Sequence, residues 1–131
     1  MDGHEQNASP MDPVALAKLK ELGGEQKPGE PDIVTSIIDL FLTETPKRLR
    51  DAQDAYKDEN LPKLELSAHS IKGSCAILGL HAMIDVCQQI ENASHNRLSA
   101  PVKPLLDQLE HMLSDAEPCL VKERDSEPSE T

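Results

Sequence analysis

The chain contains few aromatic residues and few cations. Phe41 and Tyr56 are its only phenylalanine and tyrosine, and it has no tryptophan, which excludes an aromatic platform for stacking nucleic-acid bases. Thirteen lysines and arginines stand against 24 aspartates and glutamates, which gives a formal net charge of −11. This balance argues against nucleic acid and anionic membrane surfaces as partners, because both bind clustered cations.

Long apolar runs and paired cysteines are also absent. No apolar run approaches the ~20 residues that span a bilayer, and the polar first residues lack the apolar region of a signal peptide. The three cysteines are an odd number and contain no Cys-x-x-Cys pair. We therefore expect a reducing, cytoplasmic compartment. Cys75 and Cys87 fall on apolar stripes and are predicted to be inert core thiols.

The apolar pattern between the two polar ends is helical throughout. No segment shows the period of two that is typical of a half-buried strand. Proline, aspartate and glycine mark where the helices begin and end. The pattern predicts an all-α fold, an antiparallel four-helix bundle with a short additional N-terminal helix. Helices are expected at residues 12–23, from near 31 to a turn at 58–60, at 61–78, at 80–96 and from near 100, with a loop at 24–30.

The expected bundle domain covers residues 12–117. Residues 1–11 and 118–131 are mostly polar and cannot bury enough apolar surface to offset their ordering entropy, so both are expected to be disordered tails. Pro46 lies inside the second helix and predicts a kink or a break just before it. The expected apolar positions are Val14, Leu16, Leu19 and Leu22 in the first helix, and Leu61, Leu64, Ala68, Ile71, Cys75 and Leu78 in the third.

One face of the third helix carries candidate chemistry. His69, Lys72 and Gly73 are spaced i, i+3 and i+4, so they form one surface patch. The apolar stripe places His69 at its edge, with a ring nitrogen in solvent. Imidazole is largely neutral near pH 7 and can act as a nucleophile. A glycine in mid-helix costs roughly 1 kcal/mol relative to alanine, so Gly73 indicates close approach by another molecule or close packing against a neighbouring helix.

The run from Ala68 to Gly73, followed by Leu78 and Gly79, resembles the signature of histidine-containing phosphotransfer (HPt) domains, A-H-x-L-K-G-x-x-x-x-L-G. The resemblance covers roughly residues 30–115. Two positions depart from the family pattern without touching the proposed chemistry. Isoleucine stands at position 71, where leucine is commoner, and cysteine stands at position 75, where serine or alanine is usual.

The resemblance implies a histidine phosphocarrier of multistep phosphorelays. His69 would accept a phosphoryl group from the aspartyl phosphate of one receiver domain and pass it to another receiver. Lys72 would offset the phosphoryl charge, and Gly73 would leave space for the receiver. Glu91 and Gln88, on the following helix, are candidates for steadying the other ring nitrogen.

The same resemblance implies the partners and cofactors. The expected partners are receiver domains and a hybrid sensor histidine kinase, and the chain itself is expected to be a monomer. No cofactor is expected on this chain, because Mg²⁺ would belong to the receiver, and no ATP site or kinase activity is expected either.

The sequence also bears on three other functions. A histidine kinase dimerisation domain would have an acidic residue after its histidine, where this chain has Ser70. A metal-binding bundle would have Glu-x-x-His pairs, whereas Glu65 and Glu91 each precede a histidine by four residues. A helical adaptor that binds receiver or kinase domains without phosphoryl transfer stays open. The remaining histidines are expected at the surface: His4, His81, His95 and His111.

Overall fold

The computed structural model describes residues 10–23 and 32–126. All secondary structure within these residues is helical, and none of their helices is long and apolar enough to cross a membrane. The helices are α1 (Pro13–Gly23), α2 (Ile33–Lys57), α3 (Leu61–Ile77), α4 (His81–His95) and α5 (Val102–Ser126).

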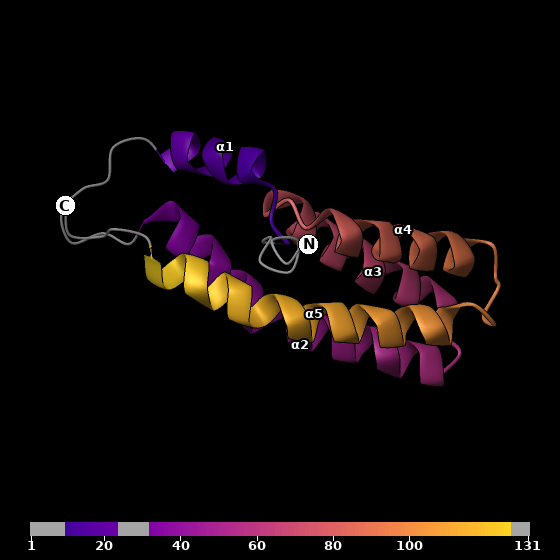
Figure 1. Cartoon of the computed structure of the whole chain (residues 1–131). Helices are drawn as coiled ribbons and strands as arrows, with labels where there is room; N and C mark the ends of the chain where they lie inside the picture. Colours follow the sequence, from indigo (N-terminus) through magenta and orange to yellow (C-terminus); the bar gives the residue numbers. More distant parts are fainter. Residues whose placement is uncertain (1–9, 24–31, 127–131) are drawn as a thin grey trace, which may run out of the picture.

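Helices α2 to α5 form the four-helix bundle. Each contacts the next in the chain, and α5 also contacts α2, which closes the bundle. Helix α1 lies outside it, along the end of the bundle where α2 begins (Figure 1). The predicted all-α architecture with one extra N-terminal helix is therefore confirmed.

Capping residues explain where the helices begin. Asp32 accepts a hydrogen bond from the backbone N–H of Thr35 at 3.3 Å and caps α2. Asn60 accepts one from the N–H of Lys63 at 3.2 Å and caps α3. Each side chain satisfies a backbone donor that has no partner within the helix. Gly79 ends the α3 turn with a φ of 66°, the left-handed conformation that glycine adopts without strain.

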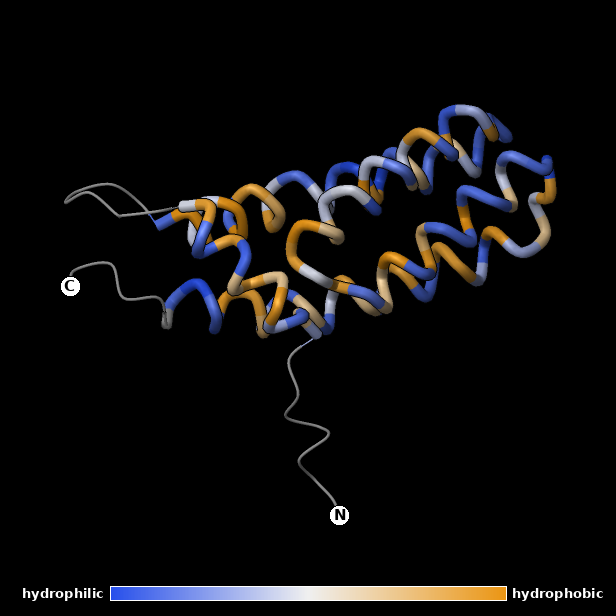
Figure 2. Tube along the Cα trace, turned by 90° about the horizontal axis from the view of Figure 1, so that it is seen from above, coloured by the Kyte–Doolittle hydropathy of each residue, from blue (hydrophilic) through white to orange (hydrophobic). Residues whose placement is uncertain are grey.

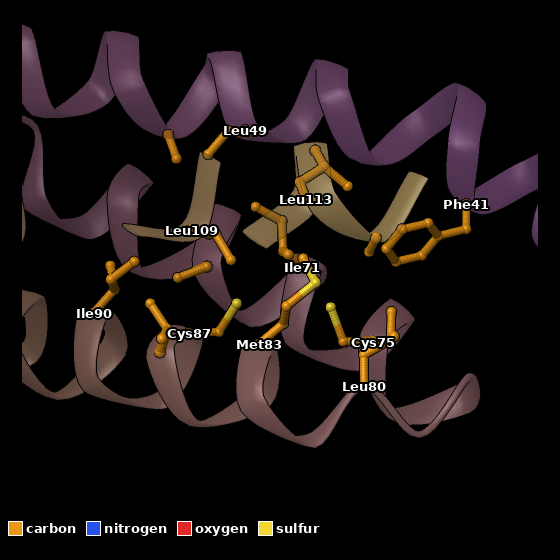
Figure 3. Close-up of a cluster of buried hydrophobic side chains, with 14 of the residues drawn as sticks. Phe41, Leu49, Ile71, Cys75, Leu80, Met83, Cys87, Ile90, Leu109 and Leu113 are labelled. Atoms are coloured by element: carbon orange, nitrogen blue, oxygen red, sulfur yellow. The ribbon is translucent and has the colours of Figure 1, made fainter. Parts of the chain in front are cut away.

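The apolar stripe predicted for α3 lies in the core. Hydrophobic and hydrophilic stretches alternate along the helices (Figure 2), as expected for amphipathic elements. Leu61, at the start of the stripe, is only partly buried. Side chains from the neighbouring helices interdigitate around the middle of the stripe (Figure 3). The fully buried members are Leu64, Ala68, Ile71, Cys75 and Leu78.

Helix α2 continues through Pro46, so of the expected kink or break the break is wrong. Proline lacks an N–H and removes one backbone hydrogen bond from a helix interior. Packing on both sides of the proline offsets that loss, because Thr45 and Leu49 are both buried in the bundle. Tertiary packing here outweighs an unfavourable local preference.

The expected domain limits, 12–117, are wrong at both ends. Residues 118–126 are helical, because α5 continues through Pro118, buries Leu120 completely and bonds Arg124 Nη1 to Asp39 Oδ1 on α2 at 2.8 Å. At the other end, Met11 is buried in the core. The rest of the expected tails, 1–9 and 127–131, lies outside the described residues, as does the loop at 24–30.

Asp12 anchors α1 to the turn between α3 and α4. Its backbone N–H donates to the carbonyl of Gly79 at 3.1 Å, and its Oδ2 lies 2.8 Å from His81 Nε2. Of the expected apolar face of α1, Leu19 is buried and Leu16 partly so. Val14 and Leu22 are 60% and 78% exposed, so that half of the prediction is wrong.

We expect the attachment of α1 to weaken in acid. The hydrogen bond from His81, followed by that from the Val14 N–H, lowers the pKa of Asp12 below its ordinary 3.8. A lowered carboxyl pKa stabilises the folded state above 3.8, and this contribution is lost as the pH falls through the folded-state value. Amide NMR signals of α1 should therefore move toward those of an unfolded peptide below that pH. In Asp12→Asn the α1 amide signals should already be shifted toward those of an unfolded peptide at pH 7. Signals of α1 that stay unchanged in acid would contradict this role of Asp12.

Candidate functional site

His69 projects from the outer face of α3, next to α4. Its side chain is 68% exposed, and its Nδ1 lies 3.2 Å from Glu91 Oε1 on α4. An ionised carboxylate can only accept a hydrogen bond, so the neutral ring donates from Nδ1–H. Its lone pair is then on Nε2, the nitrogen that does not face Glu91. When the ring is neutral, this contact therefore selects one tautomer and leaves the Nε2 lone pair available on an exposed side chain.

Glu91 connects the histidine to the lysine. Its side chain is only 12% exposed, and its buried Oε2 lies 2.8 Å from Lys72 Nζ. This contact is an ion pair without hydrogen-bond geometry, so the buried oxygen is stabilised by charge. The ammonium also donates a hydrogen bond to Gln88 Oε1 at 3.0 Å. Lys72 thus lies one turn from His69 and is held by an ion pair with Glu91 and a hydrogen bond to Gln88, both on α4.

Gly73 is exposed, and nothing occupies the space beside it. A Cβ atom built at this position would meet no atom within 4 Å, apart from its own helix backbone. Close packing against a neighbouring helix therefore does not explain this glycine. The space at Gly73, one turn from His69, is therefore open to a molecule that approaches from solvent.

An apolar cleft borders the open position. It has a volume of about 240 Å³ and lies between α2 and α3. Leu40 and Ile77 are 61% and 49% exposed although both are large and apolar. Such exposed apolar surface beside a functional group is typical of a protein-binding site. The lining residues are Ile37, Leu40, Phe41, Glu44, Arg48, Ser74 and Ile77.

The two Glu-x-x-x-His pairs cross between the helices. Glu65 of α3 contacts His95 Nδ1 of α4 at 3.4 Å, just as Glu91 of α4 contacts His69 of α3. Neither glutamate contacts the histidine of its own helix in these pairs. Within the described residues no three histidine, cysteine or acidic side chains converge as metal ligands.

The buried thiols do not contribute a nucleophile. Cys75 and Cys87 are free and lie among apolar side chains between the helices (Figure 3). The hydrogen bond with Cys75, together with burial, raises the pKa of the Cys87 thiol far above its ordinary value. Since the reactive form is the thiolate, Cys87 is unreactive.

The model of the Hpt domain family matches residues 36–118 of this chain. The chain belongs to the Hpt domain family. The matched segment begins in α2 and ends in α5, so it contains the whole α3–α4 site. The family expected from the motif around His69 is thereby confirmed.

Two curated relatives share segments with this Hpt domain. A 60-residue segment is 33% identical to "Phosphorelay intermediate protein YPD1" of Candida albicans and covers 46% of this chain and 33% of that protein. A 63-residue segment is 35% identical to "Multistep phosphorelay regulator 1" of Schizosaccharomyces pombe and covers 48% of this chain and 21% of that protein. The matches therefore span a third or less of each relative.

A solved structure has the same fold. Histidine-containing phosphotransfer protein B from Pseudomonas aeruginosa PAO1 superposes with a TM-score of 0.82 over 92% of this chain and 99% of that protein. The two sequences are 22% identical. The superposition confirms the bundle fold of this Hpt domain.

The structure brings together all five candidate residues of the site. Glu91 contacts the ring nitrogen of His69, as the candidate role required, whereas Gln88 contacts Lys72 and not the ring. The sequence interpretation did not include Asn92, which accepts a hydrogen bond from Gln88 at 2.9 Å. Its i+4 spacing from Gln88 on α4 was the available signal.

Proposed function

We propose that this Hpt domain is a histidine phosphocarrier of a multistep phosphorelay. His69 accepts a phosphoryl group from the aspartyl phosphate of one receiver domain and passes it to an aspartate of another. The observation that carries the proposal is the 3.2 Å contact between His69 Nδ1 and Glu91, which leaves an exposed Nε2 beside an open glycine. The two relatives of known name, both phosphorelay proteins, support it.

The transfer is a displacement at phosphorus. The Nε2 lone pair forms a bond to phosphorus, the bond from phosphorus to the aspartyl oxygen breaks, and its electron pair leaves on the aspartate carboxylate. The proton on Nδ1 stays in place, so the ring becomes positively charged. Glu91 Oε1, which accepts that proton's hydrogen bond, balances the new charge. The reverse displacement delivers the phosphoryl group to the next receiver.

Lys72 stabilises the incoming negative charge. Its ammonium lies on the same helix face as the histidine and is a compact point charge suited to phosphoryl oxygens. In the resting site it neutralises Glu91 at 2.8 Å. Held there, one turn from His69, the ammonium is already ordered when the phosphoryl group arrives.

Docking of the receiver uses the open side of α3. The receiver's active site must come within bonding distance of Nε2, which requires a surface without protruding side chains near residue 73. The apolar cleft beside it, with Leu40 and Ile77 exposed, supplies contact area from α2 and α3.

The same proposal covers the metal ion, the kinase that feeds the relay and the cellular compartment. Mg²⁺ is held by the receiver, and this chain contributes the nucleophile and Lys72. The phosphoryl group enters the relay through a hybrid sensor kinase, and the Hpt domain itself has no ATP site and acts as a monomer. We place it in the reducing cytoplasm, where free thiols such as those of Cys75 and Cys87 persist.

The decisive experiment is transfer of label from a radiolabelled phospho-receiver. Wild-type protein should acquire label that is lost in acid and stable in alkali, as a phosphoramidate is. Label on the carrier that is stable in acid would contradict a phosphohistidine. No transfer from a panel of receivers, with binding still detectable, would support the adaptor function instead.

We expect Lys72→Ala to slow phosphoryl transfer by about tenfold or more, the effect of losing one charge-assisted contact. The rate of label transfer measures this. Lys103→Ala, which removes a cation paired with Asp107 on α5, is the matched control and should transfer at the wild-type rate. Equal rates for Lys72→Ala and wild type would remove the role assigned to Lys72.

A further inference from the structure

A chain of side-chain hydrogen bonds on α4 leads to the site lysine. Gln88 Oε1 accepts from Lys72 Nζ at 3.0 Å, and Gln88 Nε2–H donates to Asn92 Oδ1 at 2.9 Å. Gln88 and Asn92 are one turn apart on the exposed side of α4. Asn92 therefore touches neither His69 nor Lys72 in this network, yet it is connected to the ammonium through one amide.

The orientation of the Gln88 amide decides whether Lys72 has a hydrogen-bond acceptor on this side. A glutamine side chain can rotate by half a turn, which exchanges its carbonyl oxygen and its NH₂ group. With the NH₂ group toward Lys72, the ammonium would face a donor and lose its hydrogen bond to Gln88. Asn92 Oδ1 favours the observed orientation, because it accepts a hydrogen bond from the Gln88 NH₂ group only when that group points toward Asn92.

We propose that Asn92 is a positioning residue for Lys72, acting through Gln88, an inference that rests on the phosphocarrier function proposed above. Lys72 is held between Glu91 Oε2 and Gln88 Oε1. The ion pair and the hydrogen bond together restrict its side-chain rotamers and keep the ammonium one turn from His69. Ordering the lysine before the phosphoryl group arrives lowers the entropy cost of the transfer.

Substitution at Asn92 separates this role from a structural one. Asn92 is exposed on α4, and alanine is the better helix former, so Asn92→Ala should keep or slightly raise the thermal stability. Transfer of label from the phospho-receiver should nevertheless slow by about three- to tenfold, the range expected for one hydrogen bond. Gln89→Ala, at the exposed neighbour of Gln88, is the matched control and should transfer normally.

Two further variants make the test specific. Asn92→Asp keeps an acceptor for the Gln88 NH₂ group and should restore the rate to within about twofold of wild type. In a Lys72→Ala background, Asn92→Ala should have no additional effect, because the group it positions is gone.

Three results would overturn the proposal: a wild-type rate for Asn92→Ala, no rescue by Asn92→Asp, or the same slowing in the Lys72→Ala background. Each of these leaves the phosphocarrier function intact, because wild-type protein is labelled in the same experiment. Failure of the wild type to accept label would instead overturn the proposed function itself.

Discussion

His69→Gln is expected to abolish phosphoryl acceptance while the bundle stays folded. The side chain is 68% exposed, and glutamine can still donate a hydrogen bond to Glu91 from its amide. An amide nitrogen, however, has no available lone pair with which to attack phosphorus. Labelling should therefore fall by at least about 10³-fold, as when a nucleophile is removed from an enzyme.

His95→Gln is the matched control for that loss. His95 is also exposed and is also paired through Nδ1 with a glutamate of the facing helix, at 3.4 Å. It lacks the accompanying lysine and glycine, so its replacement should leave labelling by a phospho-receiver unchanged. Circular dichroism of both variants measures the fold. Label retained by His69→Gln would assign the acceptor to another residue, and a large loss of helicity would make His69 structural.

Gly73→Arg should raise stability and yet block transfer. A side chain at position 73 meets open space, and replacing a mid-helix glycine gains up to about 1 kcal/mol of helix stability. The same side chain occupies the volume that the receiver needs next to His69. Since a misplacement of ~1 Å can cost about 100-fold in rate, we expect transfer to fall by at least that factor.

Three further variants separate obstruction of receiver docking from changes in helix stability. Gly73→Gln should block transfer as Gly73→Arg does, since the obstruction depends on volume and not on charge. Gly73→Ala should stabilise the helix and retain most of the transfer. Gly79→Ala should lower the melting temperature, because φ is 66° there and a Cβ would lie 2.6 Å from the Cβ of Asp12. Unimpaired transfer in both large variants at position 73 would refute the requirement for close approach.

The fold was predictable where burial follows a regular period. The α3 stripe has the 3-4-3-4-3 spacing of a helix with one buried face, and that face is buried. The end of α5 was not predictable in this way. Pro118 and the charged residues after it indicate a tail by local preference, whereas Leu120 packs in the core and Arg124 bonds to α2. Those contacts join segments that are far apart in the sequence, so the local pattern around residues 118–126 does not reveal them.

The functional site was also predictable from the sequence only in part. His69, Lys72 and Gly73 belong to one helix, so their spacing alone placed them on one face. The partners on α4 depend on how far α4 is shifted along α3. Spacing alone would also allow Glu91 to pair with His95 on its own helix, and the structure shows that Glu91 contacts the other candidate, His69, across the helices. The target of Gln88 could not be predicted either, since the amide serves equally well as donor or acceptor.

The crossed pairing of the two glutamates makes the nucleophile sensitive to the core. Movement of α4 along α3 by one residue, about 1.5 Å, would separate Glu91 from His69 and release the tautomer of the ring. Cys75 of α3 and Cys87 of α4, both buried, lie against each other where the two helices pack. Loss-of-function variants of this Hpt domain should therefore include substitutions of buried side chains between α3 and α4 as well as substitutions on its exposed face.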